Sequence, residues 1–429
     1  KWDQILTHPV WGYLIFLSLL ALIFQTIFAW SEVPMNLIDT VFLTLSQWTQ
    51  ATLPNGPLTD LISQGLIPGL GGVMIFIPQI SLLFGFIFVL EETGYMARVV
   101  FITDRLMRPF GLNGRSIVPL ISGVACAIPA VMATRTIDHW KERLITIMVV
   151  PLMSCSARLP VYTLLIALVV PDVSWGIFNL KGMVLMALYL VGFVAALFSA
   201  LLFKWILKTK EKSFLVMELP DYKTPRWSNL GITMLEKCKV FVWEAGKVIL
   251  AISVILWILA SYGPGDQMAS AIAKIPVPIE SAQQADYQQQ VKSVALEHSY
   301  IGIAGKWMEP AIQPLGYNWQ IGISLITSFV AREVFVGSMA TIYSVGETFE
   351  NDQTLLERMS HQRNDLGKPV YTLASGISLM LFYAFAMQCM STLAVVRRET
   401  KSWKWPLIQL VYMTALAYIS ALIAFNLLN

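Results

Sequence analysis

Long apolar runs alternate with short polar stretches along the whole chain, and this pattern predicts a helical membrane protein. A stretch of about 20 apolar residues is enough for a helix to cross the hydrocarbon core of a bilayer. Seven runs reach this length, near residues 10–30, 67–91, 144–170, 180–207, 241–262, 370–396 and 405–428. The apolar stretch 34–50 is too short and is expected to form an interfacial or hairpin element on the outer side. The predicted fold class is an all-α polytopic membrane protein with about seven full spans.

Two more segments, 116–134 and 319–345, are too polar to be ordinary spans and follow matching sequence landmarks. The landmarks are a proline, a glycine, an asparagine and a Leu-Ile pair, found at Pro109, Gly111, Asn113 and Leu120-Ile121 and again at Pro314, Gly316, Asn318 and Leu325-Ile326. A second spacing pairs Met153 and Cys155 with Met387 and Cys389. Interrupted membrane segments in matching places of a repeat are typical of transporters. We therefore expect two re-entrant or broken gate segments.

The composition excludes several classes of protein and site. With 56% hydrophobic and 13% charged residues, the chain is too apolar to be a soluble globular protein. The four cysteines form no close-spaced framework and are read as thiols, and the four histidines show no paired ligand spacing. No phosphate-cradling G-x-x-x-x-G-K-[ST] motif occurs. We expect neither an enzyme, nor a resident cofactor, nor a nucleic-acid partner.

The charged residues predict the topology. Loops rich in lysine and arginine lie near 98–115, 135–143, 204–247 and 397–404, and the positive-inside rule places them in the cytoplasm together with the N-terminus. Gate segment 116–134 is then flanked by inner loops and gate segment 319–345 by outer loops. We therefore predict two repeats that are inverted in the membrane. The alternative is a pair of ordinary spans.

The same features divide the chain into five parts. A first span and outer hairpin or interfacial segment (1–66) precede a first repeat that holds gate 1 (67–207). An amphipathic cytosolic strap (208–240) leads to a second repeat with outer loops and gate 2 (241–400), and a last span follows (401–429). Since the sequence begins at Lys1 without a methionine, we expect it to be an excised portion of a longer protein.

Cysteine and proline together suggest the chemistry of the first gate segment. Pro129 follows Cys126 by three residues in a segment that also contains Gly123, so a regular helix would lose a backbone hydrogen bond there and free carbonyl groups. A thiol beside free carbonyls suits a transition-metal ion better than magnesium or calcium. If the repeats fold alike, Cys155 and Cys389 converge on the same path. The alternative is that the cysteines only pack between helices.

Arg332 and Glu333 lie deep in the second gate segment. A charge at the centre of a membrane helix costs at least about 2.5–3.5 kcal/mol unless it faces water or a partner. We expect Glu333 to coordinate a passing cation or to hold a gate closed, with Arg332 as a gating residue. The alternative is a structural pairing with charges on neighbouring helices.

At these residues the chain resembles the membrane portion of the FeoB-type ferrous iron transporters, over nearly its whole length. The matching stretches are Gly72 to Pro78, Glu91 to Arg98, Asp104 to Arg108, Gly123 to Arg135, Met153 to Pro160, Phe214 to Pro220, Arg332 to Val334, and Gln388 to Thr392. The resemblance implies a multi-pass protein of the bacterial inner membrane that takes up Fe²⁺ through two gates. It also implies a preceding GTPase domain that uses GTP and Mg²⁺, a small cytosolic FeoA-type partner and a homo-oligomer.

The leading hypothesis is therefore a ferrous iron permease whose path runs between the gates past Cys126, Cys155 and Cys389, with Glu333 near the outer gate. A nearer alternative is a secondary transporter for another solute, either another divalent metal or a nucleoside, because paired gates alone do not name a cargo. A third hypothesis is a nucleotide-regulated membrane platform that moves no ion.

Overall fold

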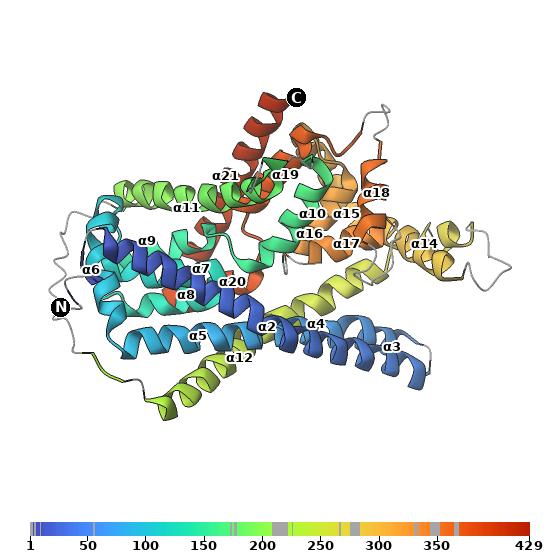
Figure 1. The fold of residues 1–429 in the computed structure, drawn as a ribbon. Coiled ribbons are helices and arrows are strands. Elements are labelled where there is room, and N and C mark those ends of the chain that lie inside the picture. Colours follow the sequence, from blue (N-terminus) through green and yellow to red (C-terminus); the bar gives the residue numbers. More distant parts are fainter. Residues whose placement is uncertain are drawn as a thin grey trace. The chain divides into compact units, whose positions relative to one another are not determined.

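A computed structural model of the chain is built almost entirely of helices (Figure 1). It describes Asp3 and residues 6–8, 10–54, 56–171, 174–175, 178–207, 222–224, 226–265, 267–274, 284–329, 332, 334–343, 352–363 and 369–429. In this part of the chain the only paired strands, β1 (Ser174–Trp175) and β2 (Phe178–Asn179), form a two-residue antiparallel hairpin. The fold class is thus all-α, as predicted.

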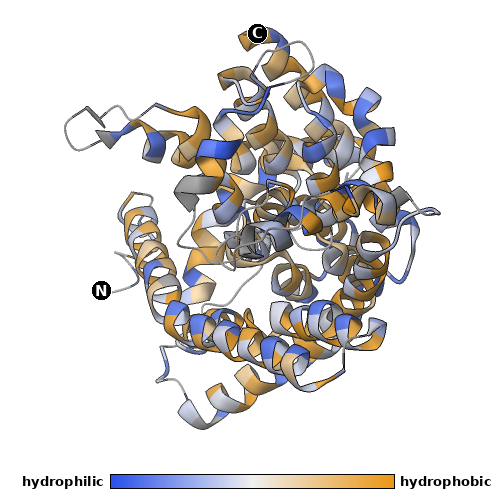
Figure 2. Ribbon diagram, turned by 90° about the vertical axis from the view of Figure 1, so that its right-hand side faces the viewer, coloured by the Kyte–Doolittle hydropathy of each residue, from blue (hydrophilic) through white to orange (hydrophobic). Residues whose placement is uncertain are grey.

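Seven helical stretches are long and apolar enough to cross a membrane. They are Trp11–Thr52, Pro57–Glu92, Trp140–Val169, Leu180–Ile206, Asn229–Ser261, Leu373–Thr400 and Lys404–Leu428. Apolar residues extend along most of these helices (Figure 2). In an 18-residue apolar window of each stretch, the buried share is 78% for Trp140–Val169 and 72% for Leu373–Thr400, and it is at most 28% for each of the other five. The prediction of a multi-pass membrane protein with seven spans is therefore confirmed.

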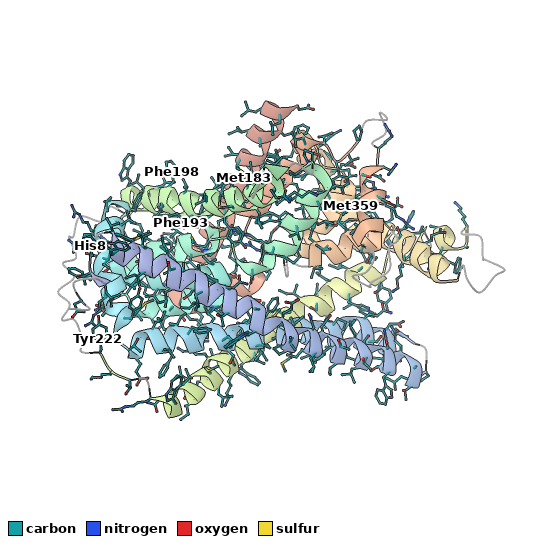
Figure 3. The ribbon with its side chains drawn as sticks, in the orientation of Figure 1. His8, Met183, Phe193, Phe198, Tyr222 and Met359 are labelled. Atoms are coloured by element: carbon teal, nitrogen blue, oxygen red, sulfur yellow. The ribbon has the colours of Figure 1, made fainter. Side chains whose placement is uncertain are left out.

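The chain forms two compact units. Unit 1 contains Lys1–Ser156, Phe193–Leu250 and Ser391–Pro406, and unit 2 contains Ala157–Gly192, Ala251–Met390 and Leu407–Asn429. Among the described α-helices, four contribute residues to both units, namely α11 (Leu180–Ile206), α12 (Trp227–Ser261), α20 (Met390–Thr400) and α21 (Lys404–Leu428). From α11, Met183 and Phe198 project outward (Figure 3) and are 46% and 67% exposed, as expected for a helix that faces lipid.

In unit 1 a long helical hairpin comes first. Helix α2 (Trp11–Thr52) packs against α4 (Ile67–Met74) and α5 (Ile77–Glu92), and α3 (Pro57–Asp60) and the π-helix η1 (Leu61–Leu66) lead back along it (Figure 1). The stretch 34–50 is not the separate short element that we expected, because it continues α2. Pro34 lies inside the helix, where it removes a single backbone donor without ending the helix.

The centre of unit 1 is formed by the segments that follow. They are α6 (Tyr95–Met107), η2 (Arg108–Phe110), η3 (Gly114–Ser116), α7 (Ile117–Ala125), α8 (Ala127–Ala133), η4 (Thr134–Thr136), α9 (Trp140–Val149) and η5 (Val150–Leu152). After a charged first turn, the rest of α9 (Leu144–Val149) is apolar on nearly all sides, and Ile145, Ile147, Met148 and Val149 are fully buried. A helix that is hydrophobic all round belongs in a protein interior. Most of α20 (Met390–Thr400) completes this unit.

Unit 2 is built around α10 (Leu159–Val169), which packs against α19 (Leu373–Phe385). Gly376 allows this approach, since a Cβ atom there would collide with the side chain of Val169. The 3₁₀ turn η6 (Ser156–Arg158) precedes α10. The other helices are α13 (Gln267–Ile272), α14 (Gln284–Glu297), α15 (Tyr300–Ile312), η8 (Gln313–Leu315), α16 (Trp319–Ser328), α17 (Val334–Ile342) and α18 (Asp352–Ser360).

The predicted strap, 208–240, is only partly covered by the structure. Residues 208–221 lie outside the described part of the chain. The amphipathic stretch from Trp227 onward is not a separate element, because it forms the first turns of α12 and runs on into the span without a break. The amphipathic pattern therefore indicates a helix here, but its polar face does not mark a boundary.

The sequence repeat corresponds to a repeat of local structure. Helices α6 and α15 have 13 residues each, and both end in a 3₁₀ turn that contains the repeated proline. Gly111 and Gly316 follow with φ of 77° and 83°, a left-handed conformation that glycine adopts without strain. Asn113 and Asn318 then cap the next helical segment with their side chains. The recurring residues are thus the start and stop signals of matching helices.

Candidate functional site

The first gate segment consists of two short helices interrupted at a single residue. Cys126, with φ of −156° and ψ of 136°, is extended and separates α7 from α8. The two helices pack against each other. With nine residues α7 is about 14 Å long, which is less than half the thickness of a hydrocarbon core. Residues 117–133 therefore form a broken segment and not a full span.

The interruption at Cys126, and not Pro129, leaves the Ala125 carbonyl without a helical donor, and the role predicted for Pro129 stays a prediction. Pro129 is the third residue of α8, where a missing N–H is tolerated. The Ala125 carbonyl instead accepts a hydrogen bond from the Ser156 hydroxyl at 3.0 Å. The Gln79 amide nitrogen donates in turn to Ser156 Oγ at 3.0 Å. These two hydrogen bonds connect α5, the Cys155 segment and the first gate segment.

The hydrogen bond between Ser156 and Ala125 places the segments of Cys126 and Cys155 side by side, because Ala125 precedes Cys126 and Ser156 follows Cys155 in the chain. Both cysteines are partly buried thiols. Gly123 lies within regular α7 and not at the break. A Cβ atom on Gly123 would lie 3.4 Å from Met153 and Val150, at van der Waals contact, so α7 lies close to the Cys155 segment here but the contact does not require glycine.

The second gate segment has the same general form. Helices α16 and α17 pack against each other, and Arg332 lies between them and is only 5% exposed. Its guanidinium donates from Nε to the Gln388 carbonyl at 3.3 Å and from Nη2 to the Ala386 carbonyl at 3.2 Å. Glu333, the predicted acidic residue, lies outside the described residues.

Cys389 lies in an interruption of its own, between the end of α19 at Phe385 and the start of α20 at Met390. It is a partly buried thiol of unit 2, and the convergence of all three thiols stays a prediction. Within the described residues no group of three or more histidine, cysteine, aspartate or glutamate side chains could hold a metal ion. The polar groups in and beside the breaks are thiols, backbone carbonyls, hydroxyls and side-chain amides.

Sequence reasoning did not select Gln79, Ser156 or Gln388. Gln79 and Gln388 are 6% and 3% exposed, and the available signal was an amide side chain within or beside an otherwise apolar span. A buried polar group requires a partner, so each isolated amide in such a run indicates a contact with another segment.

At another place in unit 1, two arginines converge on a buried carboxylate. Glu399, whose side chain is 3% exposed, binds Arg135 and Arg143, with Arg143 Nη2 at 2.7 Å and Arg135 Nε at 2.9 Å. Hydrogen bonding to Glu399 is the main reason that the pKa of Arg135 is raised. The contact ties η4, directly after the first gate, to α20. Arg135, which belongs to one of the predicted inner loops, is thus paired with Glu399 within the chain.

The N-terminal residues are held by a second polar cluster in unit 1. Asp3 Oδ1 accepts hydrogen bonds from the Tyr222 hydroxyl at 2.8 Å and from Arg98 Nε at 3.0 Å. Arg98 also stacks on the Tyr222 ring, whose centroid is 4.1 Å from the guanidinium carbon, and Tyr222 and His8 lie at the same end of the unit (Figure 3). The hydrogen bond from Tyr222, followed by that from Arg98, lowers the pKa of Asp3.

Two family models match the chain. The model described as "Gate: Nucleoside recognition" matches residues 73–169 and 242–403, which is more than half of the chain and includes both broken segments. The model described as "Ferrous iron transport protein B C terminus" matches residues 185–237. No solved structure shows a significant match.

Curated relatives match along nearly the whole chain. The "Fe(2+) transporter FeoB" of Leptospira interrogans serovar copenhageni is 45% identical over 99% of this chain and 59% of its own length. The corresponding transporter of Staphylococcus aureus strain MSSA476 is 38% identical over 99% of this chain and 58% of its own length. A "Fe(2+) transport protein A/Fe(2+) transporter FeoB fusion protein" of Porphyromonas gingivalis is 35% identical over 99% of this chain and 51% of its own length.

The chain therefore spans between half and three fifths of the length of these relatives. The match to the gate model extends across both interrupted segments. The match to the C-terminal model, at 185–237, covers much of the region between the two parts of the gate match, 73–169 and 242–403. These agreements show that the chain belongs to the Gate family and corresponds to the membrane portion of FeoB-type transporters.

Proposed function

We propose that this chain forms the permease of a ferrous iron uptake protein in the bacterial inner membrane, with its N-terminus in the cytoplasm. The observation that carries the proposal is the break at Cys126. It places a thiol beside a freed carbonyl and next to the Cys155 segment, in a chain whose relatives are named as Fe²⁺ transporters. Thiolate and carbonyl ligands together suit a transition-metal ion that must bind weakly enough to leave again.

In the proposed path the ion passes Cys126 and Cys155 at the first gate and Cys389 and Glu333 at the second. We assign Pro129 and Gly123 to gate 1, on either side of the break at Cys126, and Arg332 to gate 2. The lipid bilayer is the surrounding partner, as the exposed apolar helices require.

Regulation belongs to partners outside this chain. We propose that a GTPase domain with bound GTP and Mg²⁺ precedes the permease in the complete protein and that a small FeoA-type protein assists it. The fusion of the two transport proteins in a relative supports the latter partner. We further propose that the permease works as a homo-oligomer.

The test is ferrous iron uptake into cells under anaerobic conditions, with the protein expressed at its natural full length. Cys126→Ser, Cys155→Ser and Cys389→Ser, singly and together, should each reduce uptake at unchanged membrane levels. Cys238→Ser is the matched control, because Cys238 is also a partly buried thiol but lies in α12, away from the breaks. If the three single variants and the triple variant all take up iron as fast as the Cys238→Ser control, the three thiols only pack between helices.

A nucleoside transporter remains the second candidate, favoured by the printed description of the matching family model. Gln79, Ser156 and Gln388 are polar side chains at the breaks and would suit a hydrogen-bonding solute. The two hypotheses separate in a competition assay. Excess uridine or adenosine should leave iron uptake unchanged if iron is the cargo, whereas labelled nucleoside should accumulate if it is not.

A further inference from the structure

The interruption before Cys389 exposes backbone carbonyls within the interior of unit 2. Ala386 leaves the helical conformation with ψ of 142°, so the carbonyls of residues 386 and 388 fall outside the helical ladder. Gln388 N donates to the Ala386 carbonyl at 3.1 Å. A cluster of backbone carbonyls carries partial negative charge and is a site where a partly dehydrated cation binds.

The positively charged side chain of Arg332 already binds these carbonyls. Arg332 donates to both of them, at 3.2 and 3.3 Å. A guanidinium keeps its positive charge in proteins. Among the residues that the structure describes, no carboxylate lies within ion-pairing distance of Arg332, so at this place a positive charge is balanced by neutral oxygens.

The hydrogen bonding around this charge is incomplete. Arg332 Nη1 is a buried donor and Gln388 Oε1 a buried acceptor, and neither has a partner among the described residues. A buried polar network with unpaired members is less stable than a complete one. Replacing these hydrogen bonds of Arg332 by a different set therefore costs little free energy.

The fold itself does not require an arginine at such a break. The offset that aligns Pro109 with Pro314 aligns Ala127 with Arg332, and the first gate forms its break at Cys126 with alanine in that position. A residue needed only to close a helix interruption would be needed in both copies. The charge is thus specific to the second gate.

We infer that Arg332 is a tethered cation that occupies the Ala386 and Gln388 carbonyls in place of the transported metal ion. This inference rests on the proposed function and specifies the regulation of its second gate. While the guanidinium is bound, it satisfies the carbonyls and repels a divalent ion beside Cys389, because repulsion between like charges is strong in a weakly polarisable interior. The ion passes when Arg332 withdraws.

The first experiment measures Fe²⁺ uptake into proteoliposomes that contain the full-length protein, without nucleotide. Arg332→Gln keeps an N–H group that can donate to the carbonyls but removes the positive charge. It should raise basal uptake by about tenfold, within the usual range of about 5–150-fold for coupled sites. Arg332→Lys keeps the charge and should retain the low basal rate. Lys306→Gln removes an exposed charge that pairs with Glu297 and should change nothing.

Unchanged or reduced uptake by a folded Arg332→Gln variant would overturn the inference while leaving iron transport intact. If the wild-type protein moves no iron in the anaerobic cellular uptake assay either, the proposed function fails and the inference fails with it. An increase that Arg332→Lys shows equally would also overturn it, because the bulk of arginine and not its charge would then close the gate.

A second measurement needs no substitution of Arg332. In a protein that retains Cys389 as its sole cysteine, the rates of modification by anionic and cationic methanethiosulfonate reagents report the local potential at the thiol. The tethered cation predicts that the anionic reagent reacts faster, relative to the same pair of rates on a free thiol in solution. A faster cationic reagent would overturn the inference even if Arg332→Gln does not fold.

Discussion

Glu399 provides the strongest test of how this chain is held together, because its buried carboxylate receives two arginines from segments more than 250 residues away in sequence. Glu399→Gln keeps the shape of the side chain but removes the charge. A hydrogen bond to a charged group contributes about 1.5–3 kcal/mol. The side chain of Arg143 is 21% exposed and that of Arg135 is 51% exposed. We assign about 2 kcal/mol to the former and, after solvent screening, about 1 kcal/mol or less to the latter.

The expected loss in the free energy of unfolding is therefore about 3 kcal/mol. It is measured by reversible unfolding of the purified full-length protein in mixed micelles with increasing SDS. Glu297→Gln is the matched control, since the Glu297–Lys306 pair is exposed on both sides and should contribute less than about 1 kcal/mol. A double-mutant cycle between Glu399→Gln and Arg143→Gln should give a coupling energy of about 2 kcal/mol. If Glu399→Gln loses no more stability than Glu297→Gln, the reasoning is refuted.

Two further predictions concern the N-terminal cluster and the repeated glycines. Because the pKa of Asp3 is lowered, its contact with Tyr222 should persist as pH falls from 7 to 5 and be lost only below the ordinary aspartate value of 3.8. Hydrogen exchange of the N-terminal peptide should then differ between wild type and Asp3→Asn at pH 7 and coincide in strong acid; a difference that disappears by pH 5 would contradict this. Gly316→Ala should destabilise the protein more than Gly111→Ala in the same SDS assay, because both strain a left-handed residue by about 1–2 kcal/mol, but the new Cβ atom collides with the rigid ring of Phe425 at Gly316 and with the more adaptable side chain of Lys204, at 2.8 Å, at Gly111. Equal losses would show that the ring moves aside.

The hydrophobic pattern predicted the spans well because it records a local requirement. Each spanning helix needs its own length of apolar residues, whatever its neighbours are. The repeated Pro-Gly-Asn landmarks were informative for the same reason, since Gly316 and Asn318 act within a few residues of their own positions. The run 34–50 was misjudged because it was taken by itself as too short to span, whereas the structure continues α2 through Pro34, which removes only one donor from a long helix.

The contacts within the site depend on tertiary structure and were harder to predict. A freed carbonyl in the first gate segment was expected from the sequence, but its donor, Ser156, becomes a neighbour only once α7 packs against the next segment. The acceptors of Arg332 are backbone atoms, which carry no residue-specific signal at all. The roles of Cys126, Cys155 and Cys389 stay predictions.

The interruptions in the two most buried spans bear on what a change of conformation costs. A continuous helix must break backbone hydrogen bonds before it can bend, and in a bilayer each broken bond lacks water to replace it. Trp140–Val169 and Leu373–Thr400 are already divided near the middle, and side chains such as Arg332 hold the exposed carbonyls. A change of angle at these interruptions would therefore break no helical hydrogen bond, and its cost would lie in exchanging the polar partners of the freed backbone groups.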